Sequence, residues 1–327
     1  MQRRIFSAAL MACAASAFAQ APASHAGHDT FPSKPIRVII PSTPGGGTDY
    51  IGRSLSNHIH EITGWTLVPD NRPGAGTALG LGELARQAPT GYDIVVGQSD
   101  NVSLIPLLMK TSYDPQKDLQ PVSLVATTPM VILVAANSPY KTLNDMIADA
   151  RRKPGQINYG TSGTGGSVHI AIEMLQAEAK FTMQHVPYKG STPALADLVG
   201  GHLSVAGASI SSAVSLIQAN KVRALAVTSP GRNPALPDVP SVSESGYKNY
   251  AFVTYYGVLA PAGTPKDVVG KLNDAVVKVM ARPDVKDAFA KQGLEASTGT
   301  PEAFRELIDK DIAKAKAIIT SANIKVN

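Results

Sequence analysis

The sequence has one cysteine, Cys13, among 327 residues. Disulfide bonds, cysteine-based zinc sites and iron–sulfur clusters are therefore excluded. Aromatic residues make up 6% and charged residues 17%, and the net charge is only +5 with no block of like charges. A nucleic-acid-binding groove is therefore not expected. Hydrophobic residues amount to 44%, which favours a sizeable core over intrinsic disorder.

Long apolar runs are also scarce, apart from one at the N-terminus. Two arginines precede an apolar stretch at residues 5–16, and residues 17–19 (Ala-Phe-Ala) match a signal-peptidase site. This pattern predicts a secretory signal peptide at residues 1–19, too short to span a bilayer, and hence an exported protein. A lipoprotein signal ending at Cys13 fits poorly, because the apolar run continues beyond it. Residues 20–30 are expected to form a flexible polar tail.

Short strands alternate with helices along the rest of the chain. Strands are expected at residues 36–40, 65–68, 93–97, 124–134, 157–160, 203–207 and 222–228. Helices are expected at residues 50–63, 168–180, 212–219, 266–281, 285–292 and 301–321. This alternation predicts an α/β fold in which mainly parallel sheets are flanked by helices.

Four of the strand-to-helix junctions are rich in small and polar residues. They lie at residues 41–49, 97–101, 160–167 and 207–211. In open α/β sheets, ligands bind beyond the carboxyl ends of the strands. Two junctions fall in the first part of the chain and two in the middle, so we expect two lobes that face a shared cleft. Linkers between the lobes are expected near residues 124–130 and 248–256.

Two of these junctions are glycine-rich loops that suit an anion. Residues 45–47 are three glycines, and Thr48 or Asp49 is placed to cap the helix that follows. Residues 160–167 repeat the arrangement with several hydroxyl groups. Free backbone N–H groups and the positive end of the helix dipole form an anion site at such a terminus. Two facing sites suit a ligand with one or two carboxylates, and tight structural turns remain the alternative.

Motifs for nucleotides, metals and catalysis are missing or incomplete. Neither loop ends in the Gly-Lys-Ser/Thr of a P-loop, and no G-x-S-x-G nucleophile elbow occurs. No cofactor and no metal site is expected, and the two histidines of the polar tail are not expected to bind a metal. A secreted serine esterase that uses Ser162 and His169 is the alternative from another class. His169 is also suited to a structural role in holding its loop.

Many short motifs, in order along the chain, resemble those of one family. They are residues 31–37 (Phe-Pro-Ser-Lys-Pro-Ile-Arg), 44–49 (Pro-Gly-Gly-Gly-Thr-Asp), 71–76 (Asn-Arg-Pro-Gly-Ala-Gly), 88–92, 113–115, 185–190 (His-Val-Pro-Tyr-Lys-Gly), 223–228, 236–240 and 259–265. From about residue 31 onward the chain resembles the Bug family, the extracytoplasmic receptors of tripartite tricarboxylate transporters.

The resemblance implies a two-lobed periplasmic binding protein of type II-like fold, without catalysis. Lobe 1 would comprise residues 31–126 and 252–327, and lobe 2 residues 127–251. A monomer would close around a small carboxylate and deliver it to the permease subunits of a membrane transporter. Delivery of a signal to a sensor kinase is the alternative.

The expected ligand contacts follow the matched loops and the neighbouring junctions. They are Ser42, Thr43, Gly45, Gly46, Gly47, Thr48, Asp49, Gln98, Ser99, Thr161, Ser162, Gly163, Thr164, Gly165, Ser167, His169, Ala208 and Ser209. Ser211 is a weaker candidate, and Arg53 is expected at the surface.

Two departures from the family pattern bear on the ligand. Ser42 stands where family members often have an aromatic residue, and Ala208 where many have an aspartate that would pair with a ligand ammonium. Without that aspartate, a buried ammonium group would be costly. We therefore expect a roomy site for an aromatic mono- or dicarboxylate such as terephthalate. A citrate-like di- or tricarboxylate is the second choice.

Overall fold

The computed structural model describes residues 31–74 and 77–321. Contacts divide the chain into Met1–Phe31 and Pro32–Asn327, and the whole fold belongs to the second of these units. The predicted signal peptide and polar tail lie outside the described residues.

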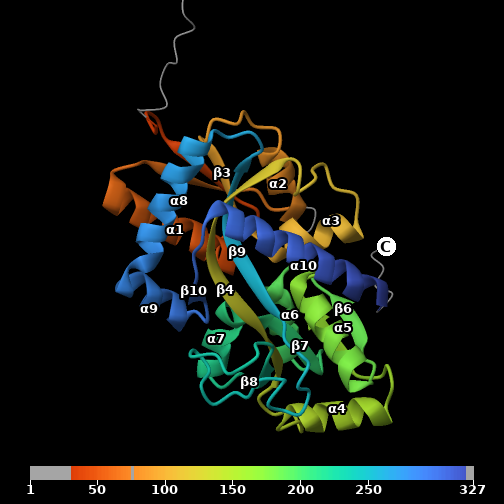
Figure 1. The fold of residues 1–327 in the computed structure, drawn as a ribbon. Helices are drawn as coiled ribbons and strands as arrows, with labels where there is room; N and C mark the ends of the chain where they lie inside the picture. The colour runs from red at the N-terminus through yellow and green to blue at the C-terminus, as the bar shows by residue number, and fades with distance from the viewer. Residues whose placement is uncertain (1–30, 75–76, 322–327) are drawn as a thin grey trace, which may run out of the picture. The chain divides into compact units, whose positions relative to one another are not determined.

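One mixed sheet runs through the unit in the order β2-β1-β3-β9-β4-β7-β5-β6, with β8 and β10 also paired to β4 (Figure 1). The strands are β1 (Ile36–Ile40), β2 (Leu67–Asn71), β3 (Asp93–Gln98), β4 (Leu119–Ala135), β5 (Asn158–Thr161), β6 (Gln184–Pro187), β7 (Val205–Ser209), β8 (Val222–Val227), β9 (Val253–Pro261) and β10 (Glu295–Ala296). The helices are α1 (Gly47–Thr63), α2 (Ala78–Leu84), the π-helix η2 (Asp100–Leu104), α3 (Ile105–Leu108), α4 (Leu143–Arg152), α5 (Ser167–Ala179), α6 (Ser191–Val199), α7 (Ile210–Gln218), α8 (Lys266–Ala281), α9 (Pro283–Lys291) and α10 (Pro301–Ser321).

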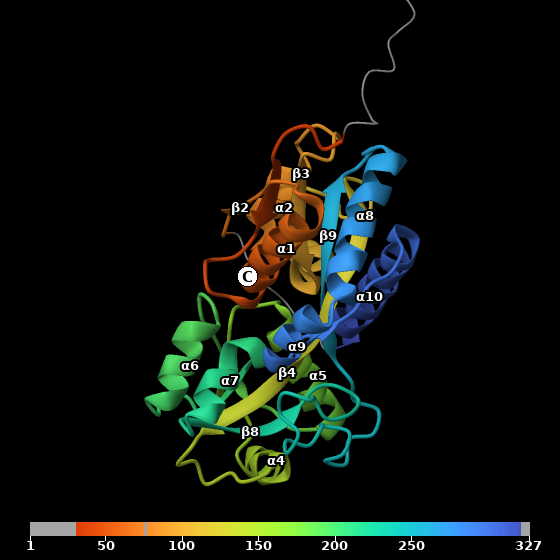
Figure 2. The ribbon, with the colours of Figure 1, turned by 90° about the vertical axis from the view of Figure 1, so that its left-hand side faces the viewer.

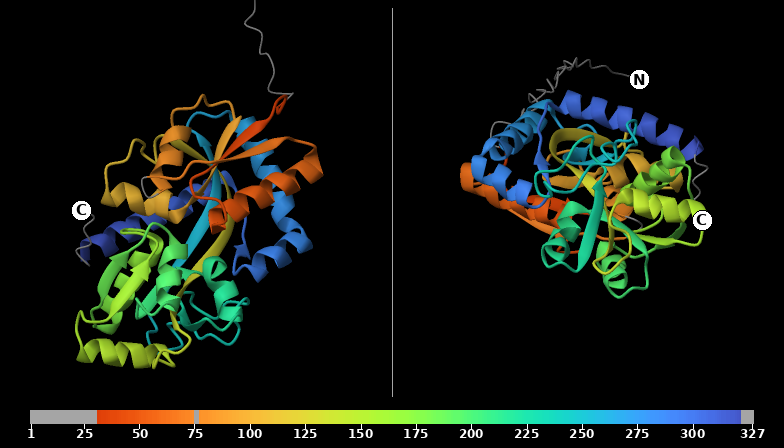
Figure 3. Two further views of the ribbon diagram at one scale, coloured as in Figure 1. Left: turned by 180° about the vertical axis from the view of Figure 1, so that it is seen from behind. Right: turned by 90° about the horizontal axis from the view of Figure 1, so that it is seen from below.

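The sheet has two halves, each built on three parallel strands. β1 pairs in parallel with β2 and β3, and β5 pairs in parallel with β6 and β7. The antiparallel strands β9, β4 and β8 complete the halves. The α/β prediction is confirmed, whereas the expected mainly parallel sheets are mixed. The difference arises because β4 and β9 pass through the sheet in opposite directions (Figure 3).

The strand β4 belongs to both halves, because it changes partners along its length. Residues 119–129 of β4 pair with β9, and residues 130–135 pair with β7 and β8. Pro129 lies where β4 changes partners, a position at which the missing N–H group of proline removes the fewest hydrogen bonds between strands. The next residue, Met130, donates its N–H to Thr228 Oγ1 at 2.7 Å. The linker expected at residues 124–130 is therefore continuous strand, and the one expected at 248–256 leads into β9.

Each half has its own hydrophobic core, and α10 contributes to both. In the first half, Phe304 and Ile308 of α10 pack with Leu81 and Leu259. In the second half, Ala315 of the same helix joins the cluster around β4, α4 and α5. α8 packs beside α1 and covers the other side of the first half (Figure 2). The predicted ends of α8 and α10 are confirmed.

Candidate functional site

The four predicted junctions follow β1, β3, β5 and β7, and each leads directly into a helix. Within each half the strands that carry them are parallel neighbours or next neighbours, so their carboxyl ends meet at one edge. Contacts also join junctions of different halves. Ser99 Oγ lies 3.2 Å from Ser167 Oγ, although 68 residues separate them in the chain.

The first loop is held in shape by Asp49. This carboxylate accepts a hydrogen bond from Gly45 N at 3.0 Å and others from Arg53 and Asn71. Burial would raise the pKa of Asp49, but these three donors hold it below its usual value. Gly45 has φ +87°, a conformation that favours glycine. Asp49 is therefore saturated by groups of its own half and supports the loop, and Arg53 is its partner.

The second junction begins at Gln98 and continues into the π-helix η2. Thr48 Oγ1 donates to Gln98 Oε1 at 2.6 Å, which ties the first two junctions together. Ser99 is buried, and the next residue, Asp100, accepts a hydrogen bond from Ser167 Oγ of the other half. Burial raises the pKa of Asp100, although the bond from Ser167 opposes this.

The second glycine-rich loop is supported from beneath by buried side chains. Thr161 Oγ1 donates to Gly163 O at 3.0 Å, and His169 Nδ1 accepts the N–H of Gly165 at 3.0 Å. The other nitrogen of His169 faces Glu173 Oε1 at 3.7 Å. Both ring nitrogens thus point at partners other than Ser162, which disfavours the Ser–His pair of an esterase. Thr161 and His169 hold the loop in place.

The fourth junction meets the first loop at the start of α7. Ser209 Oγ lies 3.1 Å from Ser211 Oγ and 2.8 Å from Ser212 Oγ. A Cβ atom built on Gly47 would lie 3.0 Å from Ser211 Oγ and 3.3 Å from Tyr256 Oη. The helix starts of α1 and α7 therefore approach each other beside the Tyr256 hydroxyl, and a larger residue at position 47 would press on both hydroxyl groups.

The structure does not bring the Ala208 side chain to this group. Ala208 is fully buried and packs with Ala206 in the core of the second half. Alternate residues of a strand share a face, so Ala206 and Ala208 both point into that core. The inference that a small residue here enlarges the ligand site was therefore wrong.

The remaining predicted residues lie on the loops themselves. Thr43 and Thr164 are exposed, and Ser42 and Ser162 are half-buried. The Ser42 Oγ atom is buried without a hydrogen-bond partner among the described residues. Buried hydroxyls normally have partners, so this atom is suited to meet a ligand or water.

Two residues at the centre of the group, Asp100 and Tyr256, were not predicted as site residues from the sequence. A Cβ atom built on Gly166 would lie 3.0 Å from Asp100 Oδ2, so Asp100 contacts the second loop directly. Burial raises the pKa of Tyr256, and the nearby Asp100 adds to the effect. Asp100 adjoins the predicted Ser99 and was within reach of sequence reasoning. Tyr256 lies on β9, where a linker was expected.

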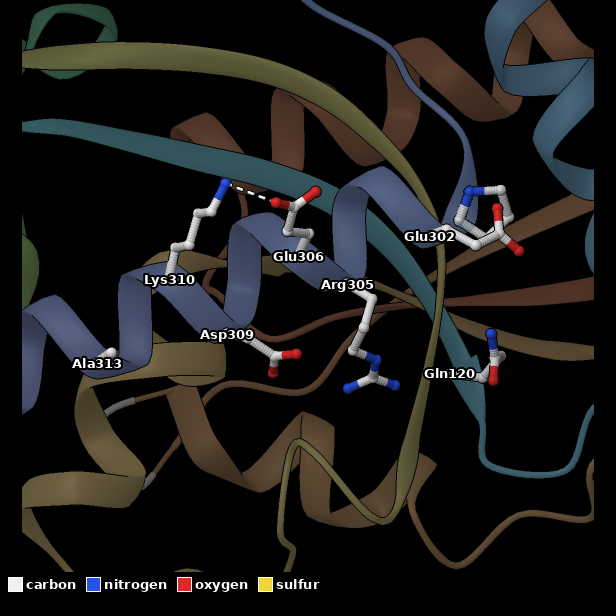
Figure 4. A pocket seen from close by; sticks show the side chains of 8 residues that line it. Gln120, Glu302, Arg305, Glu306, Asp309, Lys310 and Ala313 are labelled. Atoms are coloured by element: carbon white, nitrogen blue, oxygen red, sulfur yellow. Dashed lines mark ion pairs between the residues drawn. The ribbon is translucent and has the colours of Figure 1, made fainter.

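A separate hollow of about 570 Å³ lies along α10 (Figure 4). It is lined by Gln120, Pro301, Glu302, Arg305, Glu306, Asp309, Lys310 and Ala313. Lys310 pairs with Glu306 at 2.6 Å, and Arg305 donates to Leu119 O at 2.5 Å. None of the four junctions lines it, so the junctions and not this hollow are the candidate functional site.

Two further observations apply to residues 31–74 and 77–321. Within these ranges no group of three or more His, Cys, Asp or Glu side chains is placed to hold a metal ion. No helix there combines the length and the apolarity that a membrane crossing requires.

A family model described as the tripartite tricarboxylate transporter family receptor matches residues 51–324. This chain belongs to that receptor family. A Pseudomonas sp. protein from the tcbD–tcbE intergenic region is 36% identical over 300 residues, covering 91% of this chain and 89% of the relative. BugT of Bordetella pertussis is 30% identical and covers 91% and 92% of the two chains. The resemblance to the Bug family is therefore confirmed.

Solved structures of similar proteins confirm the two-lobed periplasmic-binding-protein fold of this receptor. The periplasmic binding protein BugD matches with a TM-score of 0.82 and 30% identity over 90% of this chain and 99% of its own. The R. palustris protein Rpa4515 with adipate matches with a TM-score of 0.86 and 28% identity, over 90% and 99%. MatC from Rhodopseudomonas palustris with bound malate gives 0.81 and 28%, over 88% and 100%.

Proposed function

We propose that this receptor captures a small carboxylate in the periplasm and delivers it to the membrane permease of a tripartite transporter, without turning it over. The main support is the convergence of the starts of α1, α5 and α7 around Asp100 and Tyr256. Helix N-termini bind anions through free N–H groups and their dipoles. Relatives solved with adipate and malate support the same ligand class.

The proposed contacts come from the two loops and the two other junctions. Backbone N–H groups of Gly46, Gly47, Thr164 and Gly166 would hold the carboxylates, since the loop glycines let a ligand approach the backbone closely. The N–H groups of Gly45, Gly163 and Gly165 already donate within the loops. Ser42, Ser99 and Ser162 would add hydroxyl donors. Asp49, Thr161 and His169 would act indirectly, because their polar atoms already bond the loops.

For the ligand, we propose an aromatic mono- or dicarboxylate, with terephthalate as the first compound to test. The small side chain of Ser42 supports this choice, whereas Ala208 no longer does. Adipate, malate and a citrate-like acid are the aliphatic alternatives. Because Ala208 lies in the core, acidic amino acids also belong in the panel.

We also propose that the two halves move as lobes, divided near residues 126/127 and 251/252. The change of β4 partners at residues 129–130 supports this division, since β4 and β9 are the strands that pass between the halves. A ligand would favour closure by contacting both halves at once. Bonds from Ser167 to Ser99 and Asp100 would help to hold the closed form.

The test is a thermal-shift and calorimetric screen of the mature protein against terephthalate, benzoate, adipate, malate, citrate, glutamate and aspartate. A ligand at 100 times its Kd stabilises the protein by about 2.7 kcal/mol. We expect stoichiometric binding, with the acid recovered unchanged. Absence of binding by every acid would contradict the carboxylate proposal. Turnover of a carboxylic ester such as p-nitrophenyl acetate would contradict the receptor proposal.

A further inference from the structure

A stack of three rings lies beneath the second glycine-rich loop. The Tyr159 and His185 rings are 5.0 Å apart between centroids, and the His185 and His169 rings only 3.9 Å apart and nearly parallel. Tyr159 and His169 are buried, and His185 is half-buried. None of the proposed ligand contacts requires two imidazoles to lie so close together, so the pair needs another explanation.

His169 must be neutral to support the loop. Its Nδ1 atom accepts the N–H of Gly165 at 3.0 Å, and a nitrogen that accepts a hydrogen bond carries no proton. The ring proton is therefore on Nε2, which faces Glu173 Oε1. That oxygen also accepts from Tyr159 Oη at 2.5 Å and from Gln176 Nε2 at 2.6 Å.

His185 supports the loop at a second point. Its Nε2 atom lies 2.7 Å from Thr161 Oγ1, which donates its one proton to Gly163 O. His185 Nε2 is therefore the donor to Thr161. Gly163 and Gly165 have φ values of +150° and +78°, so the loop adopts a conformation that favours glycine at both points of attachment.

We propose that His169 is a positioning residue for the second loop, and that proton uptake at its Nδ1 releases the Gly165 N–H and weakens ligand binding. A protonated ring would present one N–H group to another and would place a charge against the stacked His185. The ligand part of this proposal rests on the proposed function, whereas the loop-holding part does not.

The surrounding groups fix the direction of the pH effect. His169 faces Glu173 on its own helix, His185 on β6 and Tyr159 on β5, and Asp100 reaches the far side of the loop at Gly166. Burial lowers the pKa of His169, and the charge of Glu173 only partly opposes this. Burial and the charge of His169 lower the pKa of His185 to about 4.

The direction in which ligand affinity changes with pH follows from the linkage between proton binding and ligand binding. The ligand-bound loop requires neutral His169, so binding lowers its pKa further. Affinity is then constant above the ordinary histidine pKa of about 6.5. It falls as the pH drops through the lowered pKa, by up to about tenfold per pH unit.

The experiment compares adipate binding by calorimetry from about pH 7.5, above the ordinary histidine pKa of about 6.5, down to the lowest pH at which the protein stays folded. His169→Asn keeps an acceptor for Gly165 that does not titrate, and we expect an affinity within about threefold of wild type at the upper pH. The ligand affinity of this variant should not show the fall on acidification that is attributed to His169 in wild type. His169→Leu should bind about tenfold more weakly at every pH. His202→Asn, at an exposed histidine of the same half, should keep the wild-type profile.

Because adipate itself titrates, the ratio of wild-type to His169→Asn affinity is the deciding quantity. A ratio that stays constant on acidification would overturn the proposal.

A ligand-free measurement separates this proposal from the proposed function. NMR of the mature protein should show a bare Nδ1 in His169 at neutral pH. It should also show faster exchange of the Gly165 amide as the ring protonates. If none of the acids binds, the proposed function fails. The NMR measurement on the ligand-free protein then still decides whether His169 holds the loop. A protonated Nδ1 at neutral pH, or Gly165 exchange that ignores the His169 titration, would overturn it.

Discussion

At the residue scale, the candidate site depends on its small residues as much as on its polar ones. Gly47 begins α1 within van der Waals reach of Ser211 and Tyr256, so the closeness of α1, α7 and β9 rests on the absence of one methyl group. Substitutions at this position act on the approach of the two halves. Substitutions of the loop supports act on the loops themselves.

We expect Gly47→Ala to weaken binding of whichever panel acid binds wild type by about tenfold or more, while the protein stays folded. Two hydroxyl groups must move to admit the new Cβ atom, and such overpacking typically costs about 1–3 kcal/mol. Gly270→Ala is the matched control, because nothing lies within 4 Å of a Cβ atom there. Calorimetry with both variants decides, and equal affinities would contradict a close approach at Gly47.

Asp49→Asn should lower the free energy of unfolding by about 1–3 kcal/mol at neutral pH, because hydrogen bonds to a buried charge are lost. The folded-state pKa of Asp49 is lowered, so its contribution is present above the unfolded pKa and is lost as the pH falls through the folded value. Urea unfolding from pH 7 downward should therefore show the gap between wild type and variant closing in acid. A gap that is independent of pH would contradict this account.

At the element scale, local sequence signals account for the structure where they are strong. α4 begins with a capping box, in which Thr142 accepts from Asp145 N at 3.1 Å and Asp145 accepts from Thr142 N at 2.9 Å. α1 ends at Gly64, whose φ of +72° suits a residue that follows a helix. Both helix-end signals are formed by residues that lie close together in the sequence.

Thr142→Ala should lower the free energy of unfolding by about 1 kcal/mol, the usual effect of losing a helix cap. Ligand affinity should not change, since α4 takes no part in the four junctions. Urea unfolding and calorimetry on the same preparation test both statements. A loss of affinity without a loss of stability would contradict them.

The fold and site could be predicted from sequence wherever the evidence was local. The glycine-rich loops and α8 and α10 were found, because turn chemistry and helical periodicity are short-range. α4 was missed despite its capping box, and β9 was taken for a linker. The site roles of Asp100 and Tyr256 depend on partners far along the chain. Ala208 was misplaced although the alternation of β7 could have shown which face it occupies.

At the scale of the whole molecule, hydrogen bonds join the two halves beside the candidate site. Ser167, at the start of α5, contacts Ser99 and Asp100 of the other half. In the proposed lobe movement these contacts would form only when the halves meet, and they would favour the closed form over an open one.

Ser167→Ala should therefore weaken ligand binding by about tenfold, since two hydrogen bonds across the halves are removed. Small-angle scattering should show that the variant needs more ligand than wild type to reach the compact form. Ser191→Ala, at the start of α6, is the control and should behave as wild type. Unchanged affinity and unchanged scattering for Ser167→Ala would exclude this residue from closure.

The helix α10 has a consequence for how the protein is made. Phe304 packs in the core of one half and Ala315 in the cluster around β4, α4 and α5 of the other, so these two clusters are incomplete until α10 has been synthesised. Contacts this distant in sequence form slowly, and incomplete cores expose apolar surface. An unfinished chain would thus lack part of the packing of both halves until its last helix is available, which favours the less compact state in which a polypeptide can be threaded through a secretion channel.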